Sequence, residues 1–272
     1  MKGIGISYGA VSVLNAIPCG IGSTIGISLK TEAVFTDGDG QDVELIDRPK
    51  VGPMLARTCI RRTREAIGQD VDEGYHLEIR TDIPPSMGLK SSSSVSNAVI
   101  SAVLDAYGES MEPLETIRLG VKCAKECKVT ITGAFDDACG CGLGGLVITD
   151  NTKNELLLRK EIPEYDAVIC IPDGTIPKSK VPVDRYRELS DIYRSMAERI
   201  EDDYLNVLTE NGKNVERIIG RLDSLSGKAL EEGALAAGIT GTGPATAVIA
   251  KKGDGERIAK ALDCKVLIAR TR

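Results

Sequence analysis

Apolar and polar positions alternate in short runs over the first part of the chain, which predicts β-structure there. Residues 3–37 are rich in small and β-branched side chains, a composition typical of strands, and Pro18–Gly22 interrupts them with a turn signal. We therefore predict several strands in this stretch. Further elements are predicted from periodicity: strands at 43–46, 75–83 and 146–149, and helices at 53–67 and 113–126.

The pattern changes near residue 155, where short apolar runs give way to longer stretches of helical spacing. We predict strands at 156–158, 167–171 and 247–250, helices at 184–200, 203–210 and 214–224, and a closing helix and strand at 255–262 and 265–269. This alternation predicts an α+β fold, with one domain over residues 1–154 and a second over 155–272.

A helix that begins with four serines is the most informative local pattern. Ser91–Ser94 follow a proline and glycine turn, and the apolar positions after them recur at helical spacing: Val95, Ala98, Val99, Ala102, Val103 and Ala106. Serines at a helix start serve as caps in many proteins. The free N–H groups of a helix start also attract anions, and small side chains let a phosphate approach closely. Both interpretations remain open from this pattern alone.

Composition and charge narrow the class of protein. The 272 residues carry a formal net charge of −6, which disfavours a nucleic-acid-binding protein. No run approaches the roughly 18 apolar residues of a membrane span. The N-terminus lacks the pattern of a secretory leader, so we expect a cytoplasmic protein. The eight cysteines lack zinc-site spacing, and we expect them to be small buried side chains.

An acidic pair and a second glycine-rich loop add candidate chemistry. Asp136 and Asp137 lie among apolar and glycine residues, and such surroundings favour a buried carboxylate with a functional role. Residues 238–246 contain a Gly-Thr-Gly-Pro loop. Gly140–Gly145 formally matches a dinucleotide fingerprint, but the strand follows the glycines instead of preceding them, so we reject that match. The G-x-x-x-x-G-K-[ST] nucleotide loop is absent. Together these loops predict phosphate handling.

These motifs, in this order, resemble those of the GHMP small-molecule kinases, which include galacto-, homoserine and mevalonate kinases. The central motif of that family, Pro-x3-Gly-Leu-x-Ser-Ser-small, is matched from Pro84 to Ser93. The family's C-terminal glycine motif resembles 238–244, and its N-terminal substrate motif resembles 9–16 in a degraded form. The resemblance covers nearly the whole chain.

Within that family the chain resembles the archaeal-type shikimate kinases. Lys90 stands where most members have glycine, and the Leu14–Ile17 and Phe135–Ala138 stretches also fit. The chain departs from many relatives at Ile21, where a lysine is expected, so another residue must supply that charge if it is needed. It also lacks the Pro-Gly-Lys of mevalonate kinases. Homoserine kinase and a non-catalytic ligand-binding relative stay as alternatives.

The resemblance implies ATP-dependent phosphorylation of shikimate to shikimate 3-phosphate. It implies a fold with an N-terminal domain like ribosomal protein S5 domain 2, a ferredoxin-like C-terminal domain, and the active site between them. It assigns Mg²⁺ to Ser92. It gives the role of general base or orienter of the hydroxyl to Asp137 when the position is counted back from Gly144-Gly145, and to Asp136 when the Asp-x-Ala pattern is matched. The implied ATP contacts are Pro85, Ser86, Met87, Gly88, Leu89, Lys90, Ser91, Ser92 and Ser93.

The implied substrate contacts are Asn15, Thr240, Gly241, Thr242 and Gly243. A substrate carboxylate calls for a cation. The sequence does not choose among Arg57, Arg61, Lys178, Lys180 and Arg185. The expected partner is a small-molecule substrate, with no nucleic acid and no membrane, and the expected state is a monomer or a homodimer.

Overall fold

The fold is built around one long antiparallel pair of strands. The computed structural model describes residues 1–46, 52–174, 176, 180–221 and 225–272. Strand β1 (Lys2–Leu14) pairs along β2 (Ile21–Asp37), with register shifts near Gly9 and Ser12. Glycine and the β-branched residues of this stretch therefore form two long strands where several were predicted, because the irregularities are bulges within a continuous pair; the turn between the strands overlaps the predicted interruption at Pro18–Gly22.

Strand β2 is the centre of a six-stranded sheet. Its second half pairs with β4 (Tyr75–Thr81) and its first half with β5 (Leu146–Asp150). The outer strands are β3 (Gln41–Leu45), parallel to β4, and β6 (Glu155–Lys160), antiparallel to β5. Because β6 belongs to this sheet, the first sheet runs past residue 155; the domain boundary itself stays a prediction.

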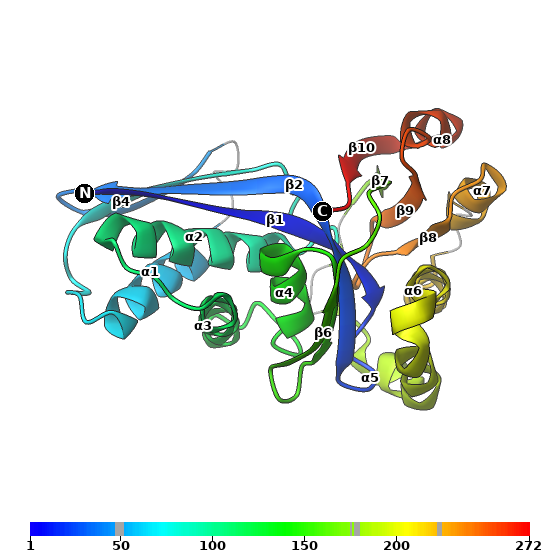
Figure 1. The fold of residues 1–272 in the computed structure, drawn as a ribbon, viewed down its shortest axis with the longest axis horizontal. Coiled ribbons are helices and arrows are strands. Elements are labelled where there is room, and N and C mark those ends of the chain that lie inside the picture. Colours follow the sequence, from blue (N-terminus) through cyan, green and yellow to red (C-terminus); the bar gives the residue numbers. More distant parts are fainter. Residues whose placement is uncertain (47–51, 175, 177–179, 222–224) are drawn as a thin grey trace.

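Four helices cover one face of this sheet (Figure 1). They are α1 (Met54–Ala66), α2 (Ser91–Tyr107), α3 (Pro113–Glu126) and α4 (Phe135–Leu143). Helix α2 packs so closely on β1 that a Cβ at Gly5 would come within 1.9 Å of the carbonyl oxygen of Ala98. Glycine at this position thus lets the serine-led helix pack backbone against backbone, which fixes where its N-terminus points.

The second sheet has the order β10-β7-β9-β8, all antiparallel. It contains β7 (Tyr165–Ile171), β8 (Ala236–Ile239), β9 (Thr246–Lys251) and β10 (Lys265–Arg270). Helices α5 (Val183–Arg187), α6 (Ser190–Ile219) and α7 (Leu225–Glu231) join β7 to β8, and α8 (Gly255–Ala261) joins β9 to β10. When these four strands are numbered 1 to 4 along the chain, they lie side by side in the order 4-1-3-2. This order, with the chain sequence β-α-β-β-α-β, is the ferredoxin-like arrangement. The predicted α+β fold is confirmed.

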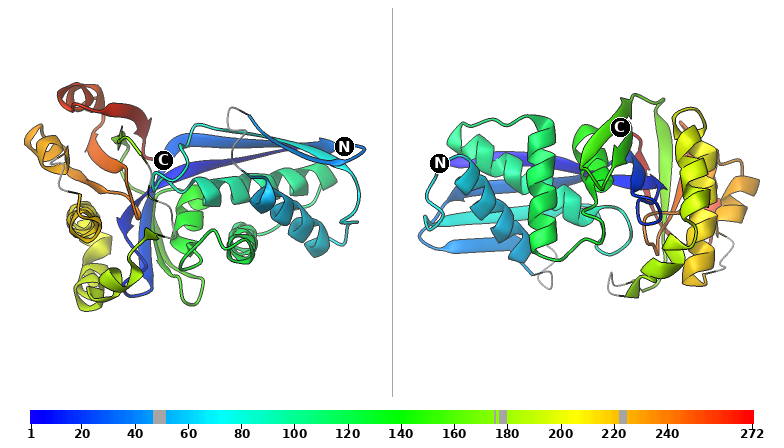
Figure 2. Two further views of the ribbon diagram at one scale, coloured as in Figure 1. Left: turned by 180° about the vertical axis from the view of Figure 1, so that it is seen from behind. Right: turned by 90° about the horizontal axis from the view of Figure 1, so that it is seen from below.

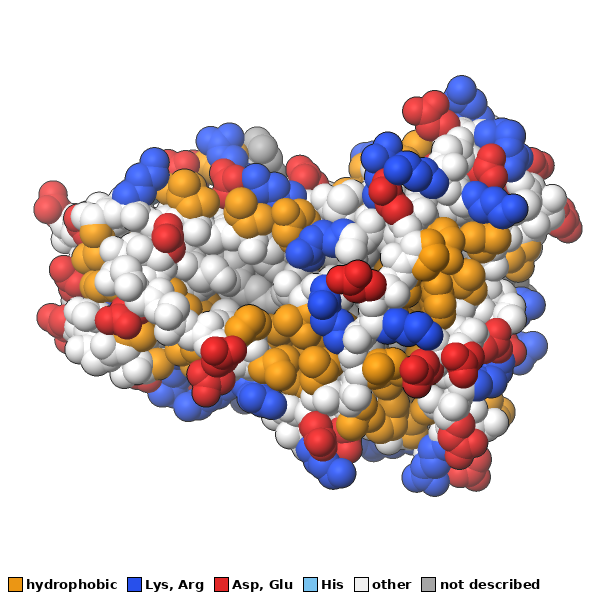
Figure 3. Space-filling view, viewed as in Figure 1, with side chains coloured by type: hydrophobic (Ala, Val, Ile, Leu, Met, Phe, Trp, Pro, Cys, Tyr) orange, Lys and Arg blue, Asp and Glu red, His pale blue; other side chains and the backbone are white. Residues whose placement is uncertain are grey.

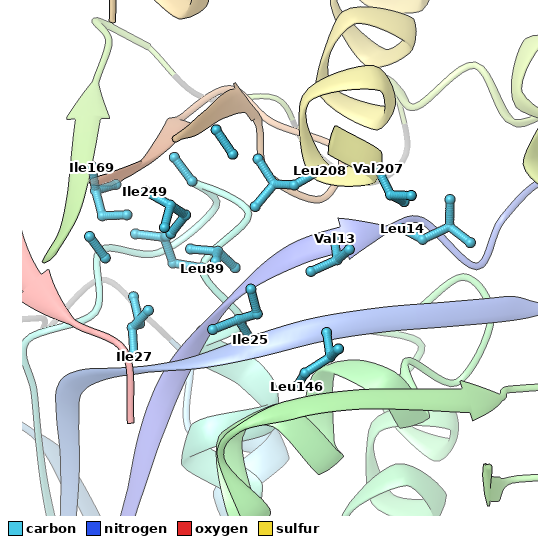
Figure 4. Close-up of a cluster of buried hydrophobic side chains, with 14 of the residues drawn as sticks. Val13, Leu14, Ile25, Ile27, Leu89, Leu146, Ile169, Val207, Leu208 and Ile249 are labelled. Carbon is cyan, nitrogen blue, oxygen red and sulfur yellow. The ribbon is translucent and has the colours of Figure 1, made fainter. Parts of the chain in front are cut away.

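The two sheets share a hydrophobic core. Alternate residues of β7 face opposite ways: Val168 and Cys170 pack beneath α7 and α8, whereas Ile169 faces the first sheet. Figure 4 shows Ile169 and Ile249 close to Leu89, above the long strands that carry Val13 and Ile25, with Leu208 of α6 beside them. The end of the chain lies between the sheets (Figures 1 and 2), where the carbonyl oxygen of Arg272 accepts a hydrogen bond from Gly145.

Three details of the second half differ from the prediction. Helix α6 runs from Ser190 to Ile219 with a kink at the non-helical residue Asp203, close to the predicted break between 200 and 203, whereas the predicted break between 210 and 214 is wrong. A single kink interrupts the apolar spacing without ending the helix. Helix α7 was not predicted, and β8 (Ala236–Ile239) runs into the first residues of the stretch predicted as a glycine loop, 238–246.

The surface carries charges of both signs. Figure 3 shows lysine and arginine interspersed with aspartate and glutamate over the face that it displays. None of the helices in the part of the chain that the structure describes is long and apolar enough to cross a membrane. The cellular location and the oligomeric state stay predictions.

Candidate active site

A cleft opens where the serine-led helix, the acidic pair and the C-terminal glycine loop come together. Its cavity has a volume of about 150 Å³. Most of the predicted site residues line it: Asn15, Ser86, Gly88, Leu89, Lys90, Ser91, Ser92, Ser93, Asp136, Asp137, Gly241, Thr242 and Gly243. Among the described residues, three predicted contacts do not line it. Pro85 is exposed, Met87 packs in the hydrophobic core, and Thr240 is buried.

The start of helix α2 is open toward this cavity. The residue before the helix is Lys90, which has a left-handed backbone (φ 67°) and makes no side-chain capping hydrogen bond. Ser91, Ser92 and Ser93 line the cavity, so the N–H groups of the first turn and three hydroxyls face the same space. The serines therefore do not act as the cap of the helix. The arrangement fits an anion site, because the helix dipole is positive at this end.

Three segments far apart in the sequence are joined by hydrogen bonds behind the cleft. The hydroxyl of Thr240 accepts a hydrogen bond from the backbone N–H of Ser12 (2.9 Å) and donates one to the carbonyl oxygen of Gly88 (3.1 Å). The amide of Asn15 donates to the carbonyl oxygen of Gly241 (2.8 Å). Thr240 thus holds the loop before α2, which contains Gly88, against both β1 and the second sheet.

Gly88 is required for this close approach. Its φ is +77°, and a Cβ there would lie 2.0 Å from the carbonyl oxygen of Thr240, which is backbone and cannot move aside. Any other residue would separate the two loops and open the back of the cleft.

The ammonium group of Lys90 lies at the centre of the site. It donates to the hydroxyl of Ser12 (2.6 Å) and pairs with the carboxylate of Asp137 at 2.7 Å, with only 5% of the lysine side chain exposed. Burial alone would lower the pKa of Lys90, but the charges of Asp137 and Asp136 outweigh it and raise that pKa. The lysine is therefore a fixed positive charge at the start of α2.

The two neighbouring aspartates differ in their surroundings. Asp136 is buried and accepts a hydrogen bond from the amide of Asn151 at 2.6 Å, while its own N–H donates to the amide oxygen of Asn151 (3.0 Å). A Cβ at Gly22 would touch its carboxylate. Burial raises the pKa of Asp136 to about 6, and the nearby charge of Asp137 adds to that rise. Asp137 has 20% of its side chain exposed to the cleft.

The candidate cations of the sequence lie away from the cleft wherever the structure describes them. Arg57 donates to the carbonyl oxygen of Gln41, and Arg61 pairs with Glu65 and Glu126 on the surface. Arg185 donates to the carbonyl oxygen of Ile218, and Lys180 is exposed. Lys178 lies outside the described residues. None of the four described candidates lines the cavity.

Several lining residues were not predicted as site residues from the sequence. They are Ala16, Ile17, Pro84, Thr130, Ile131, Thr132, Ala134 and Ile176. Thr130 and Thr132 precede the start of α4, and their hydroxyls accept hydrogen bonds from the backbone N–H groups of Gly133 and Ala134. A turn predicted at these threonines would have placed them near α4. Nothing in the sequence links Asn151 to Asp136, because that contact depends on the fold.

Comparison with known proteins gives the family. A family model described as GHMP kinases N terminal domain matches residues 54–145, and one described as GHMP kinases C terminal matches residues 188–269. The chain belongs to the GHMP kinase family. As a GHMP kinase it is an enzyme that uses ATP, and the predicted family resemblance is confirmed.

Curated relatives of this GHMP kinase align along nearly its whole length. The shikimate kinase of Methanothrix thermoacetophila is 40% identical over 96% of this chain and 90% of its own. The shikimate kinases of Methanococcoides burtonii and Pyrococcus furiosus are 35% and 34% identical, over 93% and 95% of this chain and 89% and 94% of theirs. This chain is thus similar in sequence to archaeal proteins named shikimate kinase over nearly their whole length.

Solved structures share the fold of this GHMP kinase at low sequence identity. The mevalonate kinase of Methanococcus jannaschii superposes with a TM-score of 0.81 over 100% of this chain and 99% of its own, at 16% identity. A homoserine kinase from Cytophaga hutchinsonii gives 0.76 over 100% and 95%, also at 16% identity. These matches establish the GHMP kinase fold.

Proposed function

We propose that this enzyme transfers the γ-phosphoryl group of ATP to a hydroxyl of shikimate, giving shikimate 3-phosphate. The curated relatives named shikimate kinase, at 34–40% identity over most of the chain, support the choice of substrate. The structural observation that carries the proposal is the Lys90–Asp137 ion pair at the open N-terminus of α2. It places a cation and a carboxylate where an anion and a hydroxyl would meet.

The start of α2 would bind the ATP phosphates. Backbone N–H groups and hydroxyls of Ser91, Ser92 and Ser93 face the cavity, and the dipole of the helix favours negative charge there. We assign the remaining contacts to Ser86, Gly88, Leu89 and Lys90. Pro85 and Met87 would shape this loop from outside the cavity, since one is exposed and the other lies in the core.

Magnesium would enter the site with the nucleotide. In the described residues there is no cluster of three or more histidine, cysteine or acidic side chains that could hold a metal by itself. Mg²⁺ is commonly bound by phosphate oxygens together with one or two protein oxygens, and the Ser92 hydroxyl at the cavity fits that role. When bound, the ion would neutralise charge on the β- and γ-phosphates.

Asp137 would act on the attacking hydroxyl of the substrate. Its carboxylate reaches the cleft and is held in place by Lys90, so it can orient that hydroxyl and accept its proton as the new O–P bond forms. Asp136 is tied to Asn151 in both directions and is more deeply buried. We therefore assign the base to Asp137 and a supporting position to Asp136.

Lys90 would supply the positive charge that the family resemblance leads us to expect at the position of Ile21. Ile21 packs against the hydrophobic core in this chain, whereas the Lys90 ammonium lies on Asp137. We propose that the loop lysine fixes the base and also faces the phosphoryl group. Asn15 and Gly241–Gly243 would form the opposite wall, toward the substrate.

A substrate panel tests this function. The purified protein with Mg·ATP is expected to release ADP in a coupled assay when shikimate is added, and not with homoserine, mevalonate or pantoate. A response to homoserine alone would favour the alternative of a homoserine kinase. No ADP release with any of the four, together with measurable ATP binding, would support a non-catalytic relative instead.

A further inference from the structure

A second cavity adjoins the cleft at its acidic end. Its volume is about 260 Å³, and four of its lining residues, Ala16, Ile17, Ile131 and Thr132, also line the first cavity. The other lining residues are Gly20, Asn151, Thr152, Val183 and Arg187. The amide of Asn151 is hydrogen-bonded to Asp136, so the second cavity begins one side chain away from the acidic pair.

The walls of this cavity suit a small polyhydroxylated ring. Ile17, Ile131 and Val183 offer apolar contacts for the faces of a ring, and Thr132, Asn151 and Thr152 offer side chains that hydrogen-bond to hydroxyls. A substrate whose reacting hydroxyl lies at Asp137 would extend its remaining groups into this space.

Two cations line the combined cavities within the described part of the chain. Lys90 is already paired with Asp137 and almost fully buried. Arg187 has 69% of its side chain exposed, and its guanidinium makes a 3.4 Å ion pair with Asp184, which is itself 93% exposed. An exposed ion pair of this kind contributes little free energy, so the guanidinium can exchange Asp184 for a partner that it binds more strongly.

We propose that Arg187 binds the carboxylate of the substrate. This inference rests on the proposed function, which gives the substrate both a carboxylate and a reacting hydroxyl on one small ring. With Asp136 and Asp137 lining the adjoining cleft, an anionic substrate needs a compensating cation on its other side. A guanidinium matches a carboxylate through two parallel N–H···O hydrogen bonds. Arg187 then determines selection for acids over uncharged alcohols.

Arg185 provides a matched control on the same short helix. It lies two residues earlier, carries the same charge and donates to the carbonyl oxygen of Ile218, and it does not line either cavity. An effect of net charge alone would appear equally in Arg185→Gln and Arg187→Gln. An effect of a direct contact would appear only in the second.

The experiment measures initial rates for the wild type, Arg187→Gln, Arg187→Lys and Arg185→Gln, with shikimate and with its uncharged methyl ester. We expect Arg187→Gln to raise the KM for shikimate about 10- to 100-fold, the loss of one charged hydrogen-bonded pair. The KM for ATP should stay within about twofold. Arg187→Lys should recover part of the loss, and Arg187→Gln should no longer prefer the acid over the ester.

Each outcome separates this inference from the proposed function. Wild-type activity with an unchanged KM for shikimate in Arg187→Gln would overturn the carboxylate contact and leave the function standing. A rise in the KM for ATP alone would assign Arg187 to the nucleotide and equally overturn it. If the wild type acts on homoserine, mevalonate or pantoate instead, the function fails; these are also carboxylates, so the same acid-and-ester comparison still decides the role of Arg187. Thermal unfolding checks that each variant is folded.

Discussion

Helices α2 and α4 begin on the same cleft with the same backbone geometry but opposite chemistry. Both follow a residue of positive φ, Lys90 (67°) and Ala134 (53°), and neither has a side-chain cap from that residue. The first turn of α2 presents hydroxyls, whereas the first turn of α4 contains Asp136 and Asp137. The first turn of α2 therefore contains no acidic side chain, whereas the first turn of α4 contains two.

This difference explains how one cleft can serve two roles. At α4 the aspartates complement the positive end of the helix dipole, and the N–H of Asp136 is satisfied by Asn151. At α2 the N–H groups and hydroxyls are left to a ligand, which we propose is the ATP phosphate chain. Lys90 links the two helix starts, since it precedes α2 and pairs with Asp137 of α4.

Removal of the α4 carboxylate at the cleft is expected to give the largest effect. Asp137→Asn should lower kcat by about 10³-fold, within the range for loss of a positioned acid or base. Asp136→Asn should lower kcat by less than about 10-fold, because that side chain is held by Asn151. Steady-state kinetics of the two variants measures both values. A larger loss in Asp136→Asn would exchange the two roles.

Removal of the linking charge should destabilise the protein. Lys90→Met leaves the paired carboxylate of Asp137 and the buried one of Asp136 without their cation, which should cost about 3 kcal/mol of unfolding free energy. Urea unfolding measures this loss. In a double-mutant cycle, Asp137→Asn should restore much of the stability. Additive losses would show that the two side chains are not coupled.

The hydrogen bonds that hold the α2 loop make a smaller contribution. Thr240→Val removes the partner of the Ser12 N–H and of the Gly88 carbonyl group, so we expect a loss of about 2 kcal/mol. Thr240→Ser keeps the hydroxyl and is the matched control, with a loss of under about 1 kcal/mol. Equal melting temperatures for the valine and serine variants would show that these hydrogen bonds do not hold the loop.

The buried aspartate of α4 should make the stability of the protein depend on pH. The pKa of Asp136 is raised to about 6 from an ordinary 3.8, so between these values the folded protein holds a proton that the unfolded chain has lost. This group therefore lowers stability as the pH rises through that window. This rise in the pKa by about two pH units corresponds to about 3 kcal/mol, so Asp136→Asn should gain about 3 kcal/mol of stability over the wild type at pH 8 relative to pH 4. Parallel stability curves would contradict this.

Local motifs carried most of what the sequence could predict about the site. Glycine turns, a helix start and an acidic pair are properties of short stretches and predicted phosphate handling, and the family resemblance then assigned Gly88, Ser92 and Asp137 to the site whose cleft they line. The two-sheet fold followed from periodicity and from family resemblance. The strand and helix boundaries were poorer where bulges and the kink at Asp203 interrupt the pattern.

Contacts between distant segments could not be predicted in the same way. The partner of Lys90 lies 47 positions further along the chain, and the partner of Asp136 is Asn151 on the turn after β5. Arg187 faces a cavity that exists only because α5 packs near the turn between β1 and β2. Such pairings depend on how the sheets and helices pack, and no spacing in the sequence encodes them.

Titration with ATP of a matched pair of variants tests the central claim most directly. Ser92→Asp gives α2 a carboxylate like that of α4, and should weaken ATP binding about 100-fold because the new charge faces the phosphates. Asp137→Asn should bind ATP within about threefold of the wild type. Calorimetry measures both dissociation constants. Equal losses in the two variants, or a loss in Asp137→Asn alone, would contradict the assignment of the phosphates to α2.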